Sequence, residues 1–139
     1  GLPFSMGGNK PEVKTYYEEL CAEAGVAPFV ICPEEAPQIV IVDDPDQAWA
    51  EHGQHFLLEA QTYHGWQQPH QKSVVHSHAS TVAELRDEGI YRFYTPDQAI
   101  EHAKEKGSLS LHPLCGGMPV DVAWRCAELA ADSVVKADG

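Results

Sequence analysis

The sequence predicts an α/β protein, because short apolar runs typical of strands alternate with amphipathic helical segments along its 139 residues. The clearest strand signal is residues 38–43 (QIVIVD), a β-branched run typical of a strand covered on both faces. A second informative stretch is residues 108–124 (SLSLHPLCGGMPVDVAW). Its apolar run, glycine pair and apolar-periodic segment predict a strand, a tight turn and a helix.

The first elements are short. Residues 2–5 predict an opening strand, and residues 29–32 form a second short apolar run. Between them we expect a helix that ends at about Ala24, with Asn9 as its N-cap and Gly25 as its stop signal. The residues expected on its buried face are Val13, Tyr17, Leu20, Cys21 and Ala24.

A long helix is predicted after the 38–43 strand, with Asp44 as its cap and its end near Gly65. Trp49, Phe56 and Tyr63 recur every seven residues and predict one buried stripe. The opposite side carries residues expected to be exposed, which are Glu51, Gln54 and Gln61.

The second half begins with a polar surface loop at residues 67–80. A short helix capped by Ser80 and ending at Gly89, a strand at 90–94 and a helix at 96–106 capped by Thr95 are expected next. The strand at 108–111 leads to a final helix over residues 120–136. Its buried side is predicted to hold Val120, Ala123, Trp124, Ala127, Ala131 and Val134.

Composition narrows the class of protein. The length suits a single domain over residues 1–139 with one modest core. A net charge of −12 argues against nucleic-acid partners and acidic membrane surfaces, and no apolar run approaches the length of a membrane span. Four widely spaced cysteines without a CxxC pair favour reduced thiols, and with no secretion signal we expect a cytoplasmic protein.

The candidate site is the predicted turn, with His112, Cys115, Gly116 and Gly117. Residues at the carboxyl end of a barrel strand face the active site, and glycine N–H groups before a helix N-terminus can hold a phosphate. The alternative is a purely structural turn with His112 as a partly buried polar residue. A helix N-terminus would lower the pKa of Cys115 and make it a nucleophile, but no Cys/His pair is identifiable, so we expect a structural role.

Other polar clusters have plainer explanations. His52, His55 and Glu59 lie along one side of the long helix and could bridge a metal, but we expect solvent-facing side chains. His70, His76 and His78 could bind zinc, although a loop also exposes histidines without a ligand.

The acidic and aromatic residues also have both a functional and a structural explanation. Asp43, Asp44 and Asp46 could attract a cation, but negative charge that complements the helix dipole explains them better. The tryptophans at positions 49, 66 and 124 could line a ring-binding pocket, but core or interface packing is expected. We therefore expect no metal site.

Three segments, taken in order, resemble the C-terminal end of the luciferase-like monooxygenases. They are residues 42–66 (VDDPDQAWAEHGQHFLLEAQTYHGW), 80–103 (STVAELRDEGIYRFYTPDQAIEHA) and 111–124 (LHPLCGGMPVDVAW). The start, GLPF before a helix ending YYEELCAEAG, is similar to the family's penultimate strand and helix. The resemblance implies an oxidoreductase with FMN or a deazaflavin on a (β/α) eight-fold barrel, here a partial barrel of about two βα units with an inserted strand and helices.

A complete barrel needs about 250 residues, so most of the flavin contacts and the substrate pocket have no counterpart in this chain. We expect the chain alone to be inactive and to hold no flavin tightly, and its open sheet edges predict a homo-oligomer, most simply a dimer. The alternative is a non-catalytic small α/β protein that assembles or binds a ligand.

Overall fold

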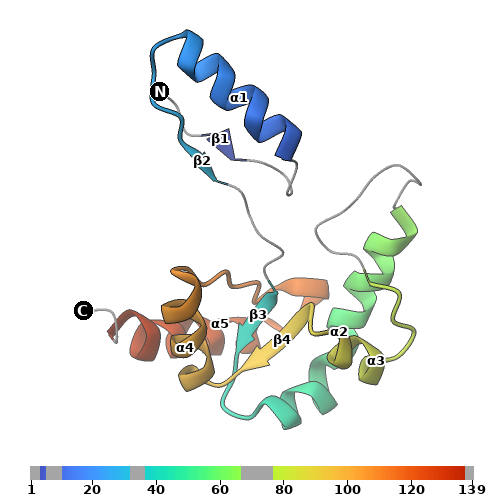
Figure 1. The fold of residues 1–139 in the computed structure, drawn as a ribbon. Coiled ribbons are helices and arrows are strands. Elements are labelled where there is room, and N and C mark those ends of the chain that lie inside the picture. Colours follow the sequence, from blue (N-terminus) through green and yellow to red (C-terminus); the bar gives the residue numbers. More distant parts are fainter. Residues whose placement is uncertain (1–3, 6–10, 32–36, 67–76, 137–139) are drawn as a thin grey trace. The chain divides into compact units, whose positions relative to one another are not determined.

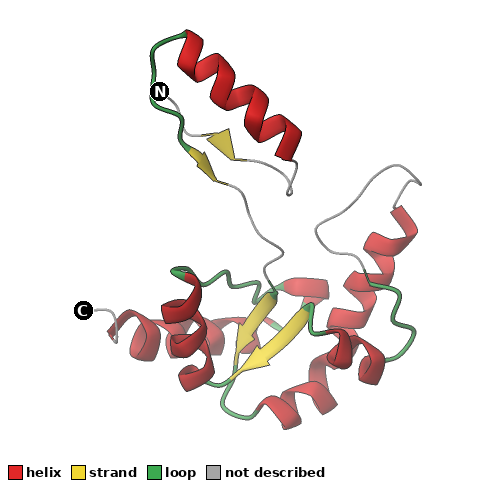
Figure 2. Ribbon diagram, viewed as in Figure 1, coloured by secondary structure: helices red, strands yellow, loops and turns green. Residues whose placement is uncertain are grey.

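The computed structural model describes residues 4–5, 11–31, 37–66 and 77–136 (Figure 1). Helices and parallel strands are mixed, and the broad α/β class is confirmed (Figure 2). The chain divides into two compact units, residues 1–36 with 72–74 and residues 37–71 with 75–139. The candidate site lies in the second unit.

The first unit is a small βαβ arrangement. Strand β1 (Phe4–Ser5) pairs parallel with β2 (Val30–Ile31), and α1 (Pro11–Glu23) connects them. The predicted cap Asn9 lies outside the described residues. The predicted buried face of α1 is confirmed for Cys21 alone; Tyr17 is partly buried, and the other predicted residues, Val13, Leu20 and Ala24, are exposed. Two strands of two residues offer too little apolar surface to cover a helix of 13 residues.

The second unit is built around two parallel strands, β3 (Gln38–Ile41) and β4 (Tyr91–Tyr94). Residues 39–42, in β3 and directly after it, are buried, as predicted for a strand covered on both faces. A further parallel bridge joins Ile39 to Leu111, so β3 lies between β4 and the Leu111 position. The predicted strand at 108–111 is therefore reduced to one bridging residue.

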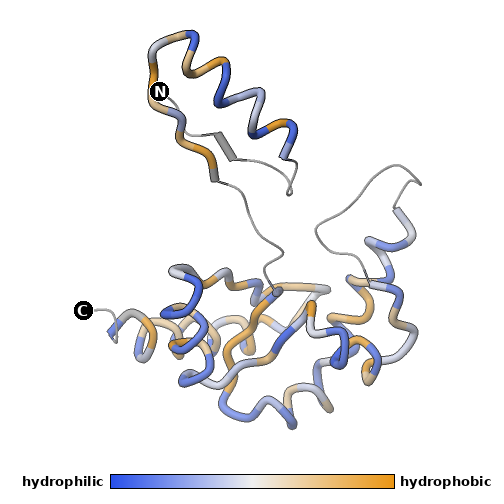
Figure 3. The backbone as a smooth tube through the Cα atoms, in the orientation of Figure 1, coloured by the Kyte–Doolittle hydropathy of each residue, from blue (hydrophilic) through white to orange (hydrophobic). Residues whose placement is uncertain are grey.

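Helices surround this pair of strands. Helices α2 (Pro45–Trp66) and α3 (Val82–Glu88) lie toward one side, and α4 (Pro96–Lys106) and α5 (Val120–Leu129) toward the other (Figure 1). The predicted last helix continues as a π-helical segment, η2 (Ala130–Val135). Hydrophobic and hydrophilic residues alternate along these helices, as expected when one side is buried (Figure 3). None of the described helices has the length and apolar character needed to cross a membrane.

Most predicted helix caps are confirmed. An Asp44 carboxylate oxygen accepts hydrogen bonds from the backbone N–H groups of Asp46 and Gln47 at 2.9 and 3.1 Å. Thr95 caps α4 in a reciprocal pair with Gln98, and Gly107 ends this helix in the left-handed conformation. These are the positions that satisfy the otherwise unpaired groups at helix ends.

The predicted cap of α3 is wrong by one residue. Thr81, and not Ser80, has the extended cap conformation, and its hydroxyl accepts the N–H of Glu84. The Glu84 carboxylate accepts the backbone N–H groups of both Thr81 and Ser80. Ser80 therefore contributes a backbone donor while Thr81 supplies the capping side chain.

Aromatic rings form the centre of the core. Trp49 packs edge-on against Phe56 and Phe93, with ring centroids 5.6 and 5.3 Å apart. Phe56 also lies 4.9 Å from the ring of Tyr91. The predicted buried stripe does not reach Tyr63, which is 40% exposed. Residues 63–66, the last of α2, are all exposed. Trp66 is 68% exposed and does not pack in the core, so interface packing stays a prediction for this residue.

The predicted buried side of the last helix is also partly wrong. Val120, Trp124, Ala127 and Ala131 are exposed, whereas Ala123 is buried and Val134 packs partly against the core. The buried side instead includes Cys126 and Leu129. Cys126 accounts for this rotation, since its Sγ atom accepts the backbone N–H of Ile41 at 3.2 Å.

Candidate functional site

The predicted glycine turn is confirmed. A short 3-10 helix, η1 (Cys115–Gly117), follows the Leu111 bridge, and both glycines have positive φ angles of 59° and 76°. The N–H of Gly117 donates to the Leu114 carbonyl at 3.3 Å, and that of Met118 donates to the Cys115 carbonyl at 3.0 Å. These backbone donors are therefore used within the turn itself.

Gly116 is pressed against helix α2. Its N–H donates to a Glu59 carboxylate oxygen at 2.7 Å, and its carbonyl accepts the His55 Nδ1–H at 3.2 Å. A Cβ atom on Gly116 would lie 1.8 Å from the His55 carbonyl oxygen, which no side chain could tolerate. The sequence therefore needs glycine here both for the backbone conformation and for the close approach.

Glu59 already holds the position expected for a bound anion. Its carboxylate accepts the N–H of Gly116, a backbone donor of the turn that points to another element. The turn is thus held by a side chain of the same unit, in a charge-assisted hydrogen bond of the stronger kind. Sequence reasoning missed this role of Glu59.

Cys115 is buried beside the same carboxylate. Burial, together with the hydrogen bond and negative charge of Glu59, raises the pKa of the Cys115 thiol. An unreactive thiol results, since the thiolate is the nucleophilic form. The alternative in which a helix N-terminus lowers this pKa is wrong, and the expected structural role fits the geometry.

Tyr91 completes the surroundings of Glu59. Its ring is fully buried, and its hydroxyl is left without a hydrogen-bond partner in the described part of the chain. Burial and the nearby Glu59 charge raise the pKa of the Tyr91 phenol. A carboxylate, a thiol and a phenol from three different elements thus meet beneath the turn.

His112 lies apart from this cluster. Its side chain is exposed, with Nε2 3.3 Å from the Ser110 hydroxyl oxygen, so the interpretation of a partly buried residue is wrong. Its backbone N–H donates to the Ile39 carbonyl at 2.9 Å and extends the parallel bridge. The imidazole is free to contact a ligand that approaches from outside the core.

The expectation that His52, His55 and Glu59 face solvent is wrong, since all three are partly buried. His55 and Glu59 lie against the turn, and their i,i+4 spacing lets one helix face contact both polar groups of Gly116. The His52 ring lies 6.3 Å from that of His55. Within the described residues, no group of three or more metal-ligating side chains is close enough to hold an ion.

The loop histidines are only partly described. His70 and His76 fall outside the described residues. His78 is exposed, and its ring lies edge-on to that of His64 with centroids 5.0 Å apart. The zinc alternative for this loop remains a hypothesis.

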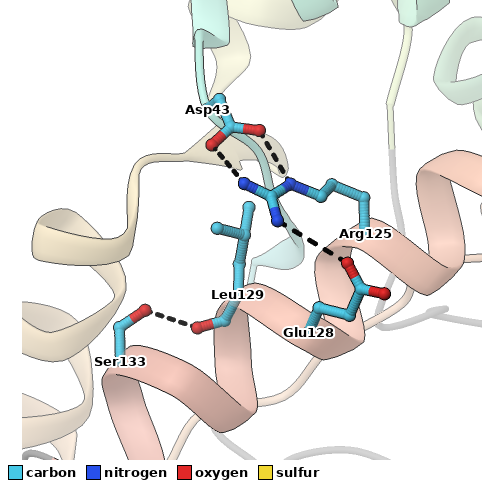
Figure 4. A network of polar contacts seen from close by, with 5 residues as sticks. All are labelled: Asp43, Arg125, Glu128, Leu129 and Ser133. Atoms are coloured by element: carbon cyan, nitrogen blue, oxygen red, sulfur yellow. Dashed lines mark hydrogen bonds and ion pairs between the residues drawn. The ribbon is translucent and has the colours of Figure 1, made fainter.

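A shallow cavity of about 250 Å³ lies at the carboxyl end of β3, beside the first turns of α2 and α5. At its wall Arg125 donates two hydrogen bonds to Asp43, at 2.9 and 2.8 Å, and approaches Glu128 at 3.6 Å (Figure 4). The Arg125 guanidinium lowers the pKa of Asp43. The acidic residues that line the cavity are Asp43, Asp44, Glu51 and Asp121.

Negative charge therefore dominates this cavity, which disfavours a phosphate group. Its aspartates have structural roles: Asp44 caps α2, and Asp46 nearby pairs with Arg86. This agrees with the interpretation of the acidic cluster as helix N-terminal charge.

No protein-family model, curated protein or solved structure matches this chain.

Proposed function

We propose that the chain is the C-terminal closing section of a luciferase-like, flavin-dependent monooxygenase, folded as a partial (β/α) barrel. The observation that carries the proposal is the Leu111 segment, which runs parallel to β3 and is followed by the glycine turn and α5. A helix begins within a few residues of β3 and β4, and α5 follows the turn after Leu111. Loops at the carboxyl ends of parallel strands are where barrel enzymes carry their chemistry.

The strand order fits this proposal if β3 and β4 belong to an insertion. Successive strands of a barrel are neighbours, whereas Leu111 bridges to β3 and not to β4. In our proposal β1 and the Leu111 segment are the barrel strands, and residues 38–94 form the inserted strands and helices. β3 and β4 pair with each other, and the core they share also contains Cys115, Cys126 and Leu129 of the closing segment.

In this proposal the Cys115–Gly117 turn and His112 lie beside FMN or a deazaflavin, and the rest of the barrel supplies the remaining contacts. Two observations argue that the chain alone does not hold the cofactor. The Gly116 N–H is already bound to Glu59, and the acidic cavity near α5 repels phosphate.

A flavin titration tests this part. We expect FMN fluorescence to show no saturable quenching by the isolated chain at micromolar concentrations. Saturation at micromolar or tighter affinity would show that the chain forms a flavin site by itself. The Glu59→Gln variant is the matched control, since it removes the charge at the turn while keeping a similar shape.

A chimera tests the family assignment. The closing section of a characterised luciferase-like monooxygenase is replaced by this whole chain. A folded chimera that binds its flavin supports the proposal. A folded chimera, shown by circular dichroism, that has lost flavin binding argues against it.

The second candidate is a non-catalytic protein that assembles as a homo-oligomer, most simply a dimer. Large exposed apolar side chains favour it, since such patches mark interfaces. Those in the second unit are Leu58, Tyr63, Trp66, Leu114, Val120 and Trp124. Colourless purified protein that scatters light as a dimer supports this candidate, and a bound yellow chromophore argues against it. Cys21, Cys115 and Cys126, the cysteines within the described residues, are free and buried, which fits the cytoplasmic location that we also propose.

A further inference from the structure

Two histidines from different segments of the second unit lie side by side, away from the glycine turn. His64 is in the last turn of α2, and His78 is in the segment that precedes α3. Their ring centroids are 5.0 Å apart, and the ring planes are inclined at 71°. Both side chains are exposed, so both imidazoles are accessible to a small ion from solvent.

The separation of these two rings suits a shared metal ion. A tetrahedral zinc ion lies about 2.0–2.1 Å from one nitrogen of each imidazole, which places the two ring centroids roughly 5 Å apart. Another histidine pair, His52 and His55 on α2, has its centroids 6.3 Å apart. At that separation the two nitrogens would lie on almost opposite sides of one ion, which a tetrahedral site does not allow.

Buried neighbours hold both histidines in position. Ser77 and Ala79, on either side of His78, are 4% and 7% exposed, and the Ser77 hydroxyl oxygen accepts the Ala79 N–H at 3.1 Å. His64 follows Ala60, which is 2% exposed, by about one helical turn. Backbone positions fixed in this way bring two ligands together before an ion binds, which lowers the entropic cost of binding.

A cavity of about 250 Å³ adjoins the two rings and provides room for further ligands of an ion. Its lining residues are Gln61, His64, Ser77, His78, Ala79 and Ser80. In the described part of the chain, no third histidine, cysteine or carboxylate lies close enough to join them. Imidazole is a ligand that zinc favours, and the net charge of −12 attracts cations to the protein.

We propose that His64 and His78 bind one zinc ion, whose remaining coordination positions are filled by water in the adjoining cavity. The site is independent of the proposed function, since neither histidine belongs to the glycine turn. The bound ion joins the last turn of α2 to the segment before α3 and stabilises the folded chain by binding it. With two protein ligands, the affinity is expected to be lower than that of a structural site with four.

Calorimetric titration of the full chain, without a histidine tag, with zinc chloride tests the site. His64→Ala and His78→Ala should each weaken zinc binding at least about tenfold, because losing even a group that orients a metal ligand costs about 10–100-fold. His52→Ala is the matched control, since it removes a histidine of the wider pair and should leave the affinity unchanged. Circular dichroism checks that each variant folds.

Three outcomes would overturn the two-histidine site. The first is a zinc affinity that survives either His64→Ala or His78→Ala. The second is an equal loss of affinity in His52→Ala, which would indicate nonspecific binding by histidines. The third comes from the double variant His70→Ala/His76→Ala, which tests the loop alternative. This variant should bind zinc like the wild type, and a loss of binding would move the site to the loop.

A measurement on the wild type keeps the proposal testable if a variant does not fold. Proton NMR follows the ring signals of all histidines as zinc is added. The signals of His64 and His78 should shift together and reach their end point at one ion per chain. Zinc-induced shifts confined to other histidines, or no saturable shift at any histidine, would overturn the proposal.

Discussion

Both units of this chain contain helices with an apolar side, but the two units bury very different shares of their apolar side chains. In the second unit, β3 is covered on both faces and four aromatic rings pack together beneath the helices. In the first unit, α1 buries Cys21 alone, and Tyr16 and Leu20 are 63% and 46% exposed. An amphipathic pattern therefore predicts that a helix has an apolar side, and the neighbouring strands decide whether that side is covered.

Strand length explains the difference. Strands β3 and β4 have four residues each, and a third parallel segment joins them through Leu111. Strands β1 and β2 have two residues each. Small units bury too small a fraction of their surface to be stable alone, so the stability of this protein should come from its second unit.

The largest expected effect is the loss of a core aromatic in the second unit. Trp49→Ala should lower the free energy of unfolding by about 3–5 kcal/mol, because it leaves a cavity beside the packed rings of Phe56 and Phe93. Tyr16→Ala in the first unit should change it by less than about 0.5 kcal/mol. Urea denaturation measures both, and equal effects of the two substitutions would refute the contrast between the units.

The next effect separates two adjacent glycines of the turn. Gly116→Ala should cost about 3 kcal/mol, because a positive φ is unfavourable for alanine and its Cβ would collide with the His55 carbonyl. Gly117→Ala meets nothing within 4 Å and should cost about 1 kcal/mol for its backbone conformation alone. Thermal unfolding of both variants measures the difference, and the same cost at both positions would contradict the close approach to α2.

A smaller effect is expected where Glu59 holds the turn. Glu59→Ala should lower the free energy of unfolding by about 1–3 kcal/mol, since the Gly116 N–H loses its acceptor. It should also bring the pKa of the Cys115 thiol down, because the carboxylate contributes to raising it. Thiol labelling as a function of pH follows the second change.

Glu51→Ala on the exposed side of the same helix is the control, and it should change stability by less than about 0.5 kcal/mol. An unchanged rate of Cys115 labelling in Glu59→Ala would mean that the carboxylate does not act on the thiol.

The smallest effect concerns the exposed ion pair of Asp43 and Arg125. Because the pKa of Asp43 is lowered in the folded protein, the pair stabilises the fold above the ordinary aspartate pKa of about 3.9. That contribution is lost as the pH falls through the folded pKa. Arg125→Met should raise the pKa of Asp43 toward its ordinary value, as measured by NMR titration of the carboxyl carbon. Arg92→Met, at a guanidinium bonded to the Gly89 carbonyl, should leave it unchanged.

Much of the fold followed from local chemistry. Asp44, Thr95, Gly89 and Gly107 mark helix ends as predicted, because caps and left-handed glycines satisfy backbone groups within a few residues. The β-branched run at 38–43 identified the buried strand for a similarly local reason.

The candidate site shows where that reasoning stops. The glycine turn was predicted, but its partners on α2 were assigned to solvent, because His55 and Glu59 lie more than fifty residues earlier in the chain. Only their i,i+4 spacing signalled a shared face, and spacing does not identify what that face contacts.

The sequence by itself determined most of the segments that become helices and strands, most of the helix ends, and the glycine turn before α5, although the strand expected at 108–111 is a single bridging residue. Those properties depend on backbone conformation and on neighbours within one or two turns. The tertiary structure alone decided which side of α5 is buried and why Gly116 must be glycine. The Cys126–Ile41 hydrogen bond and the His55 carbonyl impose these two outcomes, and both contacts join residues that meet only when the chain has folded.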